Sequence, residues 1–181
     1  MKMLRTIRFD ASDDHIYEVA SPGEEWAISG GAAFTGIDAQ ALQGKVRQAF
    51  ANGFLGLGSF GRSTFVSVGE ATVAQRDEAL AALAAHLRDA HHVPQAMAEQ
   101  AARAELDDAC ALAAELPIHT VLTVRRVLAD GGEIEEEFRT IAAPTGDKPH
   151  AQIWSVVPDE GDDASASAVT SDGPPPAGER P

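Results

Sequence analysis

Residues 117–141 read PIHTVLTVRRVLADGGEIEEEFRTI, and in this stretch two apolar runs flank the turn sequence Asp130-Gly131-Gly132. A glycine-rich turn between two such runs is typical of a β-hairpin, because glycine adopts the positive φ angles that tight turns require. The sequence therefore predicts that an antiparallel hairpin lies at this point of the chain.

The loop length of this hairpin decides which residues face each other. A two-residue turn would place the apolar residues of the first run opposite glutamates, whereas a three-residue loop pairs Leu128 with Ile134 and Val124 with Phe138. Since a shift of one residue moves every side chain of a strand to the other face, we expect the second register. Gly132 would then adopt the left-handed conformation.

Two charged pairs follow from this register. Arg125 faces Glu137 on the outer face, and Arg126 faces Glu136 on the core side between apolar pairs. A charged pair on the core side is costly unless it is well hydrogen-bonded or lies near an edge. Arg126 is therefore either an anion anchor in a binding pocket or one half of an ion pair at the periphery of the helix layer.

The preceding chain contains several further elements. Short apolar runs separated by turn clusters predict strands, and apolar residues spaced by three and four predict a helix that begins at Asp38 and ends near Asn52. The predicted strands lie at Leu4–Phe9, Ile16–Ala20, about Trp26–Phe34 and Ser63–Val68.

Two alanine-rich helices precede the hairpin. Thr72 and Gln75 match a capping box, which predicts a helix that runs to the break at residues 91–94. A second helix extends to about Leu116, and a last strand, Gln152–Val157, follows the hairpin. The order βββ-α-β-αα-βββ predicts an α+β fold, in which about three helices pack on one face of a mainly antiparallel sheet.

Composition separates the chain into a domain and a tail. Residues 1–157 are long enough for a single α+β domain, whereas residues 158–181 are acidic, rich in Pro, Ser and Ala, and almost free of large apolar side chains. Such a segment cannot bury enough surface to offset the entropy of ordering it, so we expect a disordered tail.

Charge and hydropathy exclude several classes of function. The chain has 14 basic and 28 acidic residues, a formal charge of −14, which argues against binding nucleic acid or an anionic membrane. Charges interrupt each apolar run near the N-terminus, so neither a signal peptide nor a membrane span is expected. The expected location is therefore cytoplasmic.

A glycine-rich block is the most suggestive motif. Residues 56–61, GLGSFG, match the dinucleotide fingerprint G-x-G-x-x-G literally. The fingerprint requires a strand before the glycines and a helix after them, whereas here a predicted helix precedes them and a β-prone run follows. The alternatives are a nucleotide loop and a flexible or bulged hairpin.

A second hypothesis for this block is a site for a carboxylate or phosphate. Backbone N–H groups, hydroxyl side chains and one guanidinium lie within a short span, which is the composition of an anion-binding nest. The candidate ligand-binding residues are Gly58, Ser59, Gly61, Arg62, Ser63 and Thr64, together with Arg126.

Histidine and cysteine give weaker signals. His86, His91 and His92 lie near Asp89, but their spacing is not the i, i+4 spacing that places two imidazoles on one helix face. An imidazolium at a helix end also stabilises the helix dipole, so we expect no metal site. Cys110 lies in an apolar stripe and is expected to be a small core residue.

Three segments resemble a family of small bacterial proteins of unknown function. They are Leu4-Arg5-Thr6-Ile7-Arg8, residues 53–65 (GFLGLGSFGRSTF) and Phe138-Arg139-Thr140, and the resemblance covers roughly residues 1–142. The family is associated with gene neighbourhoods that hold cofactor ligases and accessory proteins of molybdenum-dependent redox enzymes. The resemblance therefore implies an accessory role, and it transfers no catalytic residue.

Three classes of function remain. The first is a non-catalytic cytosolic accessory or binding protein, linked to maturation of a molybdenum-type redox enzyme. The alternative is a small-molecule or anion-binding domain, or a small enzyme, that uses residues 53–64 and Arg126. The third is a structural or oligomeric domain. We expect a protein partner or a homo-oligomer, and we expect no cofactor.

Overall fold

The computed structural model describes residues 1–34, 37–38, 40–129 and 133–141. The expected conformation of Gly132, the predicted strand Gln152–Val157 and the predicted tail, residues 158–181, lie outside the described residues.

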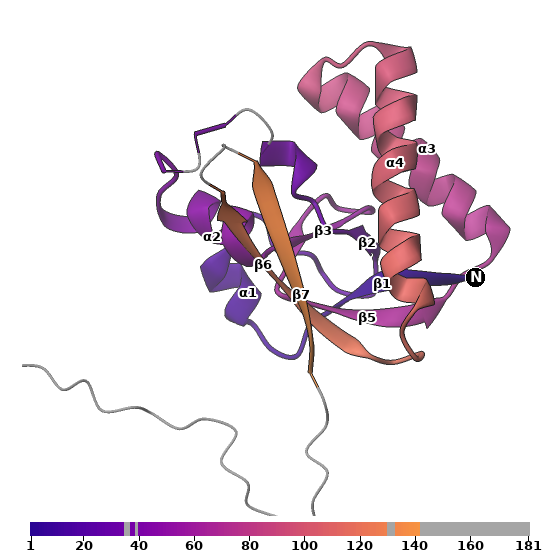
Figure 1. The fold of residues 1–181 in the computed structure, drawn as a ribbon, viewed down its shortest axis with the longest axis horizontal. Helices are drawn as coiled ribbons and strands as arrows, with labels where there is room; N and C mark the ends of the chain where they lie inside the picture. Colours follow the sequence, from indigo (N-terminus) through magenta and orange to yellow (C-terminus); the bar gives the residue numbers. More distant parts are fainter. Residues whose placement is uncertain (35–36, 39, 130–132, 142–181) are drawn as a thin grey trace, which may run out of the picture. The chain divides into compact units, whose positions relative to one another are not determined.

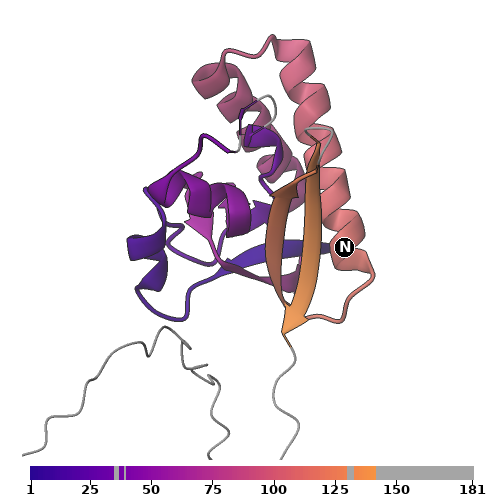
Figure 2. The same cartoon turned by 60° about the vertical axis from the view of Figure 1, so that its left-hand side comes forward.

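The described part of the chain contains a 7-stranded antiparallel sheet with the strand order β4-β3-β2-β1-β5-β6-β7. The sheet curls strongly, as Figures 1 and 2 show. The strands are β1 (Lys2–Ile7), β2 (Trp26–Ile28), β3 (Phe54–Gly56), β4 (Arg62–Ser63), β5 (Phe65–Glu70), β6 (Val121–Leu128) and β7 (Ile134–Ile141).

The helices connect these strands. They are α1 (Ser12–Ile16), α2 (Gly44–Asn52), α3 (Val73–His91) and α4 (Gln95–Ala114), and a short 3-10 turn spans Ala32–Phe34. The predicted capping box at the start of α3 is confirmed, because the Thr72 hydroxyl accepts a hydrogen bond from the Gln75 backbone N–H and the Gln75 side chain accepts one from the Thr72 N–H. No helix in the described residues is both long and apolar enough to span a membrane.

Helix α4 packs against β1 and β2, and helix α2 packs against β6. Phe138 of β7 lines a hollow together with Ala109 of α4. Arg126 shares the face of Phe138, because Phe138 pairs with Val124 and side chains two residues apart on a strand point the same way. From that face Arg126 contacts Phe50 in α2. The predicted α+β fold, with helices packed on one face of an antiparallel sheet, is confirmed.

The core lies between this face and α4. It joins buried side chains of β1, β3, β5 and β6 to the small residues of α4, which allow close approach of the helix to the sheet. The largest fully buried members of this core are Phe54, Met3, Leu4, Leu83, Leu106, Leu122, Val66 and Val68.

The predicted hairpin register is confirmed. Leu128 pairs with Ile134 and Val124 pairs with Phe138. The charged pairs follow, with Arg125 opposite Glu137 and Arg126 opposite Glu136. Side chains alternate between the two faces of a strand, so burial of the apolar face selects this register, as expected.

Three predicted elements between residues 16 and 52 differ from the structure. The strand Ile16–Ala20 was wrong: the segment begins at the end of α1, and Ala20 makes only an isolated bridge with Arg62. The strand expected over Trp26–Phe34 ends at Ile28, because Gly30 adopts a φ of 76° and a 3-10 turn follows.

The helix expected from Asp38 begins instead at Gly44. The Asp38 carboxylate accepts a hydrogen bond from the Gln40 N–H, and its carbonyl accepts one from the Ala41 N–H. These bonds form a local turn, which is the usual alternative to a helix for a short acidic side chain. The strand expected over Ser63–Val68 is divided between β4 and β5, which begin at Arg62 and Phe65.

Candidate functional site

The glycine-rich block forms the β3–β4 hairpin, in which Phe54 pairs with Ser63 and Leu55 with Arg62. The hairpin interpretation of the block is confirmed, and the strand–loop–helix arrangement of a dinucleotide site is absent from this described segment. The glycines therefore need another explanation than a bound pyrophosphate.

That explanation is a carboxylate of the protein itself. A Cβ atom on Gly56 would clash with Oε2 of Glu25, and one on Gly58 would lie 2.7 Å from Oε1. The hydroxyls of Ser21 and Ser59 each donate a hydrogen bond to Oε2, at 2.9 Å. The block thus surrounds the Glu25 side chain, and two of its glycines provide the space.

Gly61 is required for a different reason. Its position lies against the backbone of the segment before β2, so that a Cβ atom there would come within 2.7 Å of the Ala20 carbonyl group and the Ser21 nitrogen. The residue with positive φ in this turn is Phe60, at 55°, rather than Gly58. Gly58 is therefore needed for space and not for backbone conformation.

Arg62 points into the fold. Its Nη1 donates to the carbonyls of Gly30 and Gly53, at 3.0 and 3.3 Å, and its guanidinium lies over the ring of Phe34. Burial, together with the nearby positive charge of Arg126, lowers the pKa of Arg62 to about 10.

The Arg126 side chain is completely buried, with 0% of its surface exposed. Its Nη1 donates to the carbonyls of Phe50 and Gly53, both at 2.9 Å, its Nη2 donates to the Ser29 carbonyl, and its Nε donates to Glu136. Every guanidinium nitrogen therefore has a protein acceptor. Arg62 and Arg126 meet at a single acceptor, the Gly53 carbonyl.

The structure brings part of the predicted binding set together. Arg62 and Arg126 are neighbours, whereas the Ser59 hydroxyl bonds Glu25 and the Ser63 hydroxyl bonds the backbone of Ile7 and Phe65. The Thr64 hydroxyl donates to the buried carboxylate of Asp13 at 2.6 Å. These side chains all hold the fold, and their binding of an external ligand stays a prediction.

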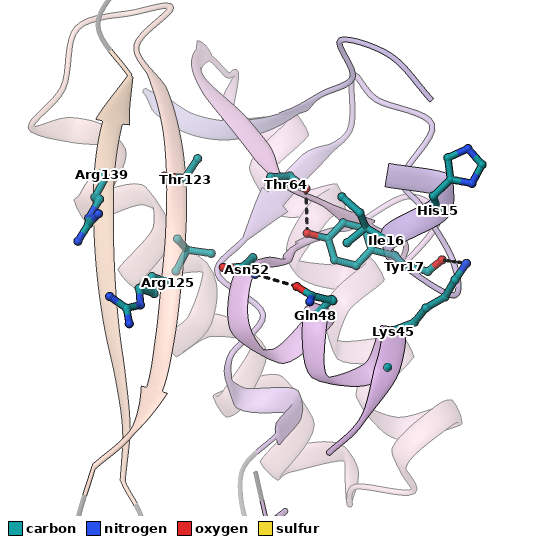
Figure 3. A pocket seen from close by; sticks show the side chains of 12 residues that line it. His15, Ile16, Tyr17, Lys45, Gln48, Asn52, Thr64, Thr123, Arg125 and Arg139 are labelled. Carbon is teal, nitrogen blue, oxygen red and sulfur yellow. Dashed lines mark hydrogen bonds between the residues drawn. The ribbon is translucent and has the colours of Figure 1, made fainter. Parts of the chain in front are cut away.

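A groove of about 840 Å³ lies next to Thr64, between the helices α1 and α2 and the strands β6 and β7. Figure 3 shows the side chains of the two helices on one side and those of the hairpin on the other. The groove is lined by His15, Ile16, Tyr17, Gly44, Lys45, Gln48, Asn52, Thr64, Thr123, Val124, Arg125 and Arg139.

Cationic side chains dominate the rim of this groove. Lys45 donates to the carbonyls of Asp14 and Tyr17, both at 3.0 Å. Arg139 bonds Glu137 through Nε and Nη2, at 2.9 and 3.0 Å. Arg125 is exposed and has no hydrogen bond or ion pair with the described residues. The lining contains no aspartate or glutamate from the described residues.

The floor of the groove is a chain of hydroxyl groups. Because a carboxylate only accepts, Thr64 gives its proton to Asp13, and the Tyr17 hydroxyl, 3.0 Å away, must then donate to Thr64. Burial raises the pKa of Tyr17 to about 12, so the phenol stays neutral near neutral pH. These hydroxyls are therefore committed to internal hydrogen bonds.

The histidines at the end of α3 do not form a ligand cluster. His86 stacks on Phe60 with ring centroids 3.7 Å apart, and the His91 ring lies 5.2 Å from it, edge to face. Among the described residues there is no group of His, Cys, Asp and Glu that could hold a metal. Cys110 is half-buried against the core, and its burial raises the pKa of the thiol.

Sequence reasoning missed the groove because its walls are far apart in the chain. His15 and Lys45 come from helices whose positions against β6 are set by tertiary contacts. The one available signal was the alternation of basic residues with Glu137 on the outer face of the hairpin, at Arg125 and Arg139. That pattern predicted an ion pair between Arg125 and Glu137, which is wrong, because Glu137 bonds Arg139 instead and Arg125 lies beside the groove.

Replacing Arg126 by Met should lower the free energy of unfolding by about 3–5 kcal/mol, because three buried carbonyls and Glu136 lose their donor. Urea denaturation measures this loss. Arg125→Met, the same change at the neighbouring exposed position, should cost less than about 1 kcal/mol. Equal costs in both variants would contradict the role given to Arg126.

Alanine substitutions should separate the two glycine roles. Gly61→Ala should lower the free energy of unfolding by about 1–3 kcal/mol, because its Cβ atom would meet backbone that cannot move alone. Gly58→Ala should cost less, since the Glu25 side chain it meets can rotate. A larger loss for Gly58→Ala in thermal or urea unfolding would refute this assignment.

The chain contains a single tyrosine, so ultraviolet absorbance reports the ionisation of Tyr17 alone. The native protein should ionise with a midpoint near 12, against about 10 in urea. Because the folded pKa is raised, Tyr17 contributes stability below pH 10 that is lost as pH rises toward 12. A native midpoint near 10 would mean that the phenol is solvated.

Comparison with known proteins identifies a family but no individual relative. No curated protein matches the chain significantly, and no solved structure does. Residues 1–155 match DUF6505, a family of unknown function, and this match covers all the elements that build the sheet, the glycine-rich hairpin and the groove. The chain therefore belongs to the family of unknown function DUF6505.

Proposed function

We propose that this protein is a non-catalytic, cytosolic binding protein that holds an anionic group, a carboxylate or a phosphate, in the groove between α1, α2 and the β6–β7 hairpin. The observation that carries the proposal is the charge of the groove. In a chain with 28 acidic and 14 basic residues, its lining includes Lys45, Arg125 and Arg139 but none of the described acids.

The donors needed for an anion are available at the rim. An ammonium group has three N–H donors, and Lys45 uses two of them on backbone carbonyls, which leaves one for a ligand. Arg125 has its full guanidinium to offer, and Arg139 has the nitrogen that Glu137 does not engage. These donors favour a ligand with several anionic oxygens, since guanidinium groups bind such oxygens in pairs.

The alternative site at residues 53–64 and Arg126 has weaker support. Its arginines are buried and bonded to carbonyls, and its hydroxyls bond other groups of the protein. An incoming anion would have to displace these bonds. The groove offers comparable donors without that cost.

A binding role fits the chemistry of the groove better than catalysis does. The Thr64 hydroxyl donates to the buried carboxylate of Asp13 and accepts from the Tyr17 hydroxyl, so both hydroxyls are already engaged by groups of the protein. Binding without reaction is what an accessory protein requires. The wider role in maturing a molybdenum-type redox enzyme is part of this proposal and rests on the family resemblance.

Inorganic pyrophosphate is a suitable first probe, because it carries several anionic oxygens and no apolar group. Its binding therefore depends only on the hydrogen-bond donors of the groove. Titration followed by backbone amide NMR should give saturable shifts in α2 and β6. Arg125→Ala should weaken this binding about tenfold, which corresponds to the loss of one charge-assisted hydrogen bond.

Arg103→Ala is the matched control, because Arg103 is an exposed arginine of α4 and makes the same change in net charge. It should leave pyrophosphate binding unchanged. Equal weakening by both substitutions would mean that the anion responds to overall charge and not to the groove, and the proposal would then be abandoned.

A further inference from the structure

Strand β7 has an edge that no described strand covers. It is the last strand in the sheet, it pairs with β6 along its full length, and no other strand among residues 1–34, 37–38, 40–129 and 133–141 lies beside it. Strand edges of this kind present unpaired backbone N–H and C=O groups, which can pair with another chain.

The register of the hairpin shows which backbone groups face outward. The Ala129 N–H donates to the Glu133 carbonyl at 2.8 Å, so this pair is a hydrogen-bonded one. In an antiparallel ladder such pairs recur at every second residue. Glu135, Glu137 and Arg139 therefore direct their backbone groups toward β6. The backbone groups of Glu136, Phe138 and Thr140 point outward.

These outward groups allow a two-fold pairing of β7 with a second copy. When Phe138 pairs with Phe138 of the other copy, Glu136 pairs with Thr140, and Glu137 lies opposite Arg139 twice, once on each side of the axis. The pairs between Glu137 and Arg139 are then non-hydrogen-bonded pairs, in which the side chains lie closest together. Both side chains are accessible, with 54% and 61% of their surfaces exposed.

Neighbouring registers are electrostatically worse. A two-fold axis at Glu137 places Glu137 against itself, and an axis at Glu136 places Glu135 against Glu137 twice. An axis at Arg139 places two arginines together. Like charges directly opposite each other destabilise a strand pair. The axis at Phe138 alone among these gives opposite charges without a like-charged pair.

We propose that a second copy of this chain binds along β7, with the two-fold axis at Phe138, so that one sheet continues through both copies. A two-fold contact uses the same patch on both copies, and the sequence of β7 is complementary to itself in this register. A contact made by one pair of strands buries little surface, so the dimer forms and dissociates reversibly.

Two single charge reversals test this register. Glu137→Arg places arginines opposite each other twice, and Arg139→Glu places glutamates opposite each other twice. Each variant alone should dimerise at least about tenfold more weakly than the natural chain, because two attractive pairs become two repulsive ones. Sedimentation velocity over a range of concentrations measures the dissociation constant.

Mixing the two variants is the decisive step. In a mixed dimer each position 137 faces a position 139 of opposite charge, so the mixture should recover dimerisation while neither variant does so alone. Native mass spectrometry, with one variant isotopically labelled, identifies the mixed dimer. Circular dichroism checks that each variant is folded.

Arg47→Glu is the control, because Arg47 is an exposed residue of α2 and receives the same charge reversal away from β7. It should dimerise as the natural chain does. A natural chain that stays monomeric at every concentration would overturn the proposal. A dimer that survives both reversals, or a mixture that recovers nothing, would overturn it as well.

Discussion

A buried guanidinium needs acceptors for its donors, and much of this fold is arranged around supplying them to Arg126. The acceptors come from the last turn of α2, from Gly53 between α2 and β3, and from the segment after β2. Without these acceptors the guanidinium would be a buried charge with unsatisfied donors. The curl of the sheet and the position of α2 are therefore parts of one constraint.

The groove follows from that constraint. When Arg126 holds the end of α2 against β6, the exposed side of the same helix, with Lys45 and Gln48, is set opposite Arg125. Two adjacent residues of β6 therefore have different roles. Arg126 faces inward and holds α2, while Arg125 faces outward and is available to a ligand in the groove. Both roles arise because successive side chains of a β-strand point to opposite faces of the sheet.

Patterns among residues close together in the chain predicted the elements that short-range interactions determine. The register of the β6–β7 hairpin follows from apolar matching, and the start of α3 follows from a capping box of four residues. The segment around α1 could not be predicted this way, because Asp13 is held by Thr64, 51 residues away. The glycine-rich block shows the same limit: its spacing suggested a phosphate, and the anion it surrounds is Glu25.

The contacts of Arg126 also bear on how the molecule folds. The Phe50 carbonyl and Arg126 are 76 residues apart, and the Gly53 carbonyl and Arg126 are 73 residues apart, so these hydrogen bonds close long loops. Closing a long loop has an entropic cost, which the bonds formed at Arg126 must offset. Contacts between residues so far apart raise the contact order of the fold, and a higher contact order accompanies slower folding.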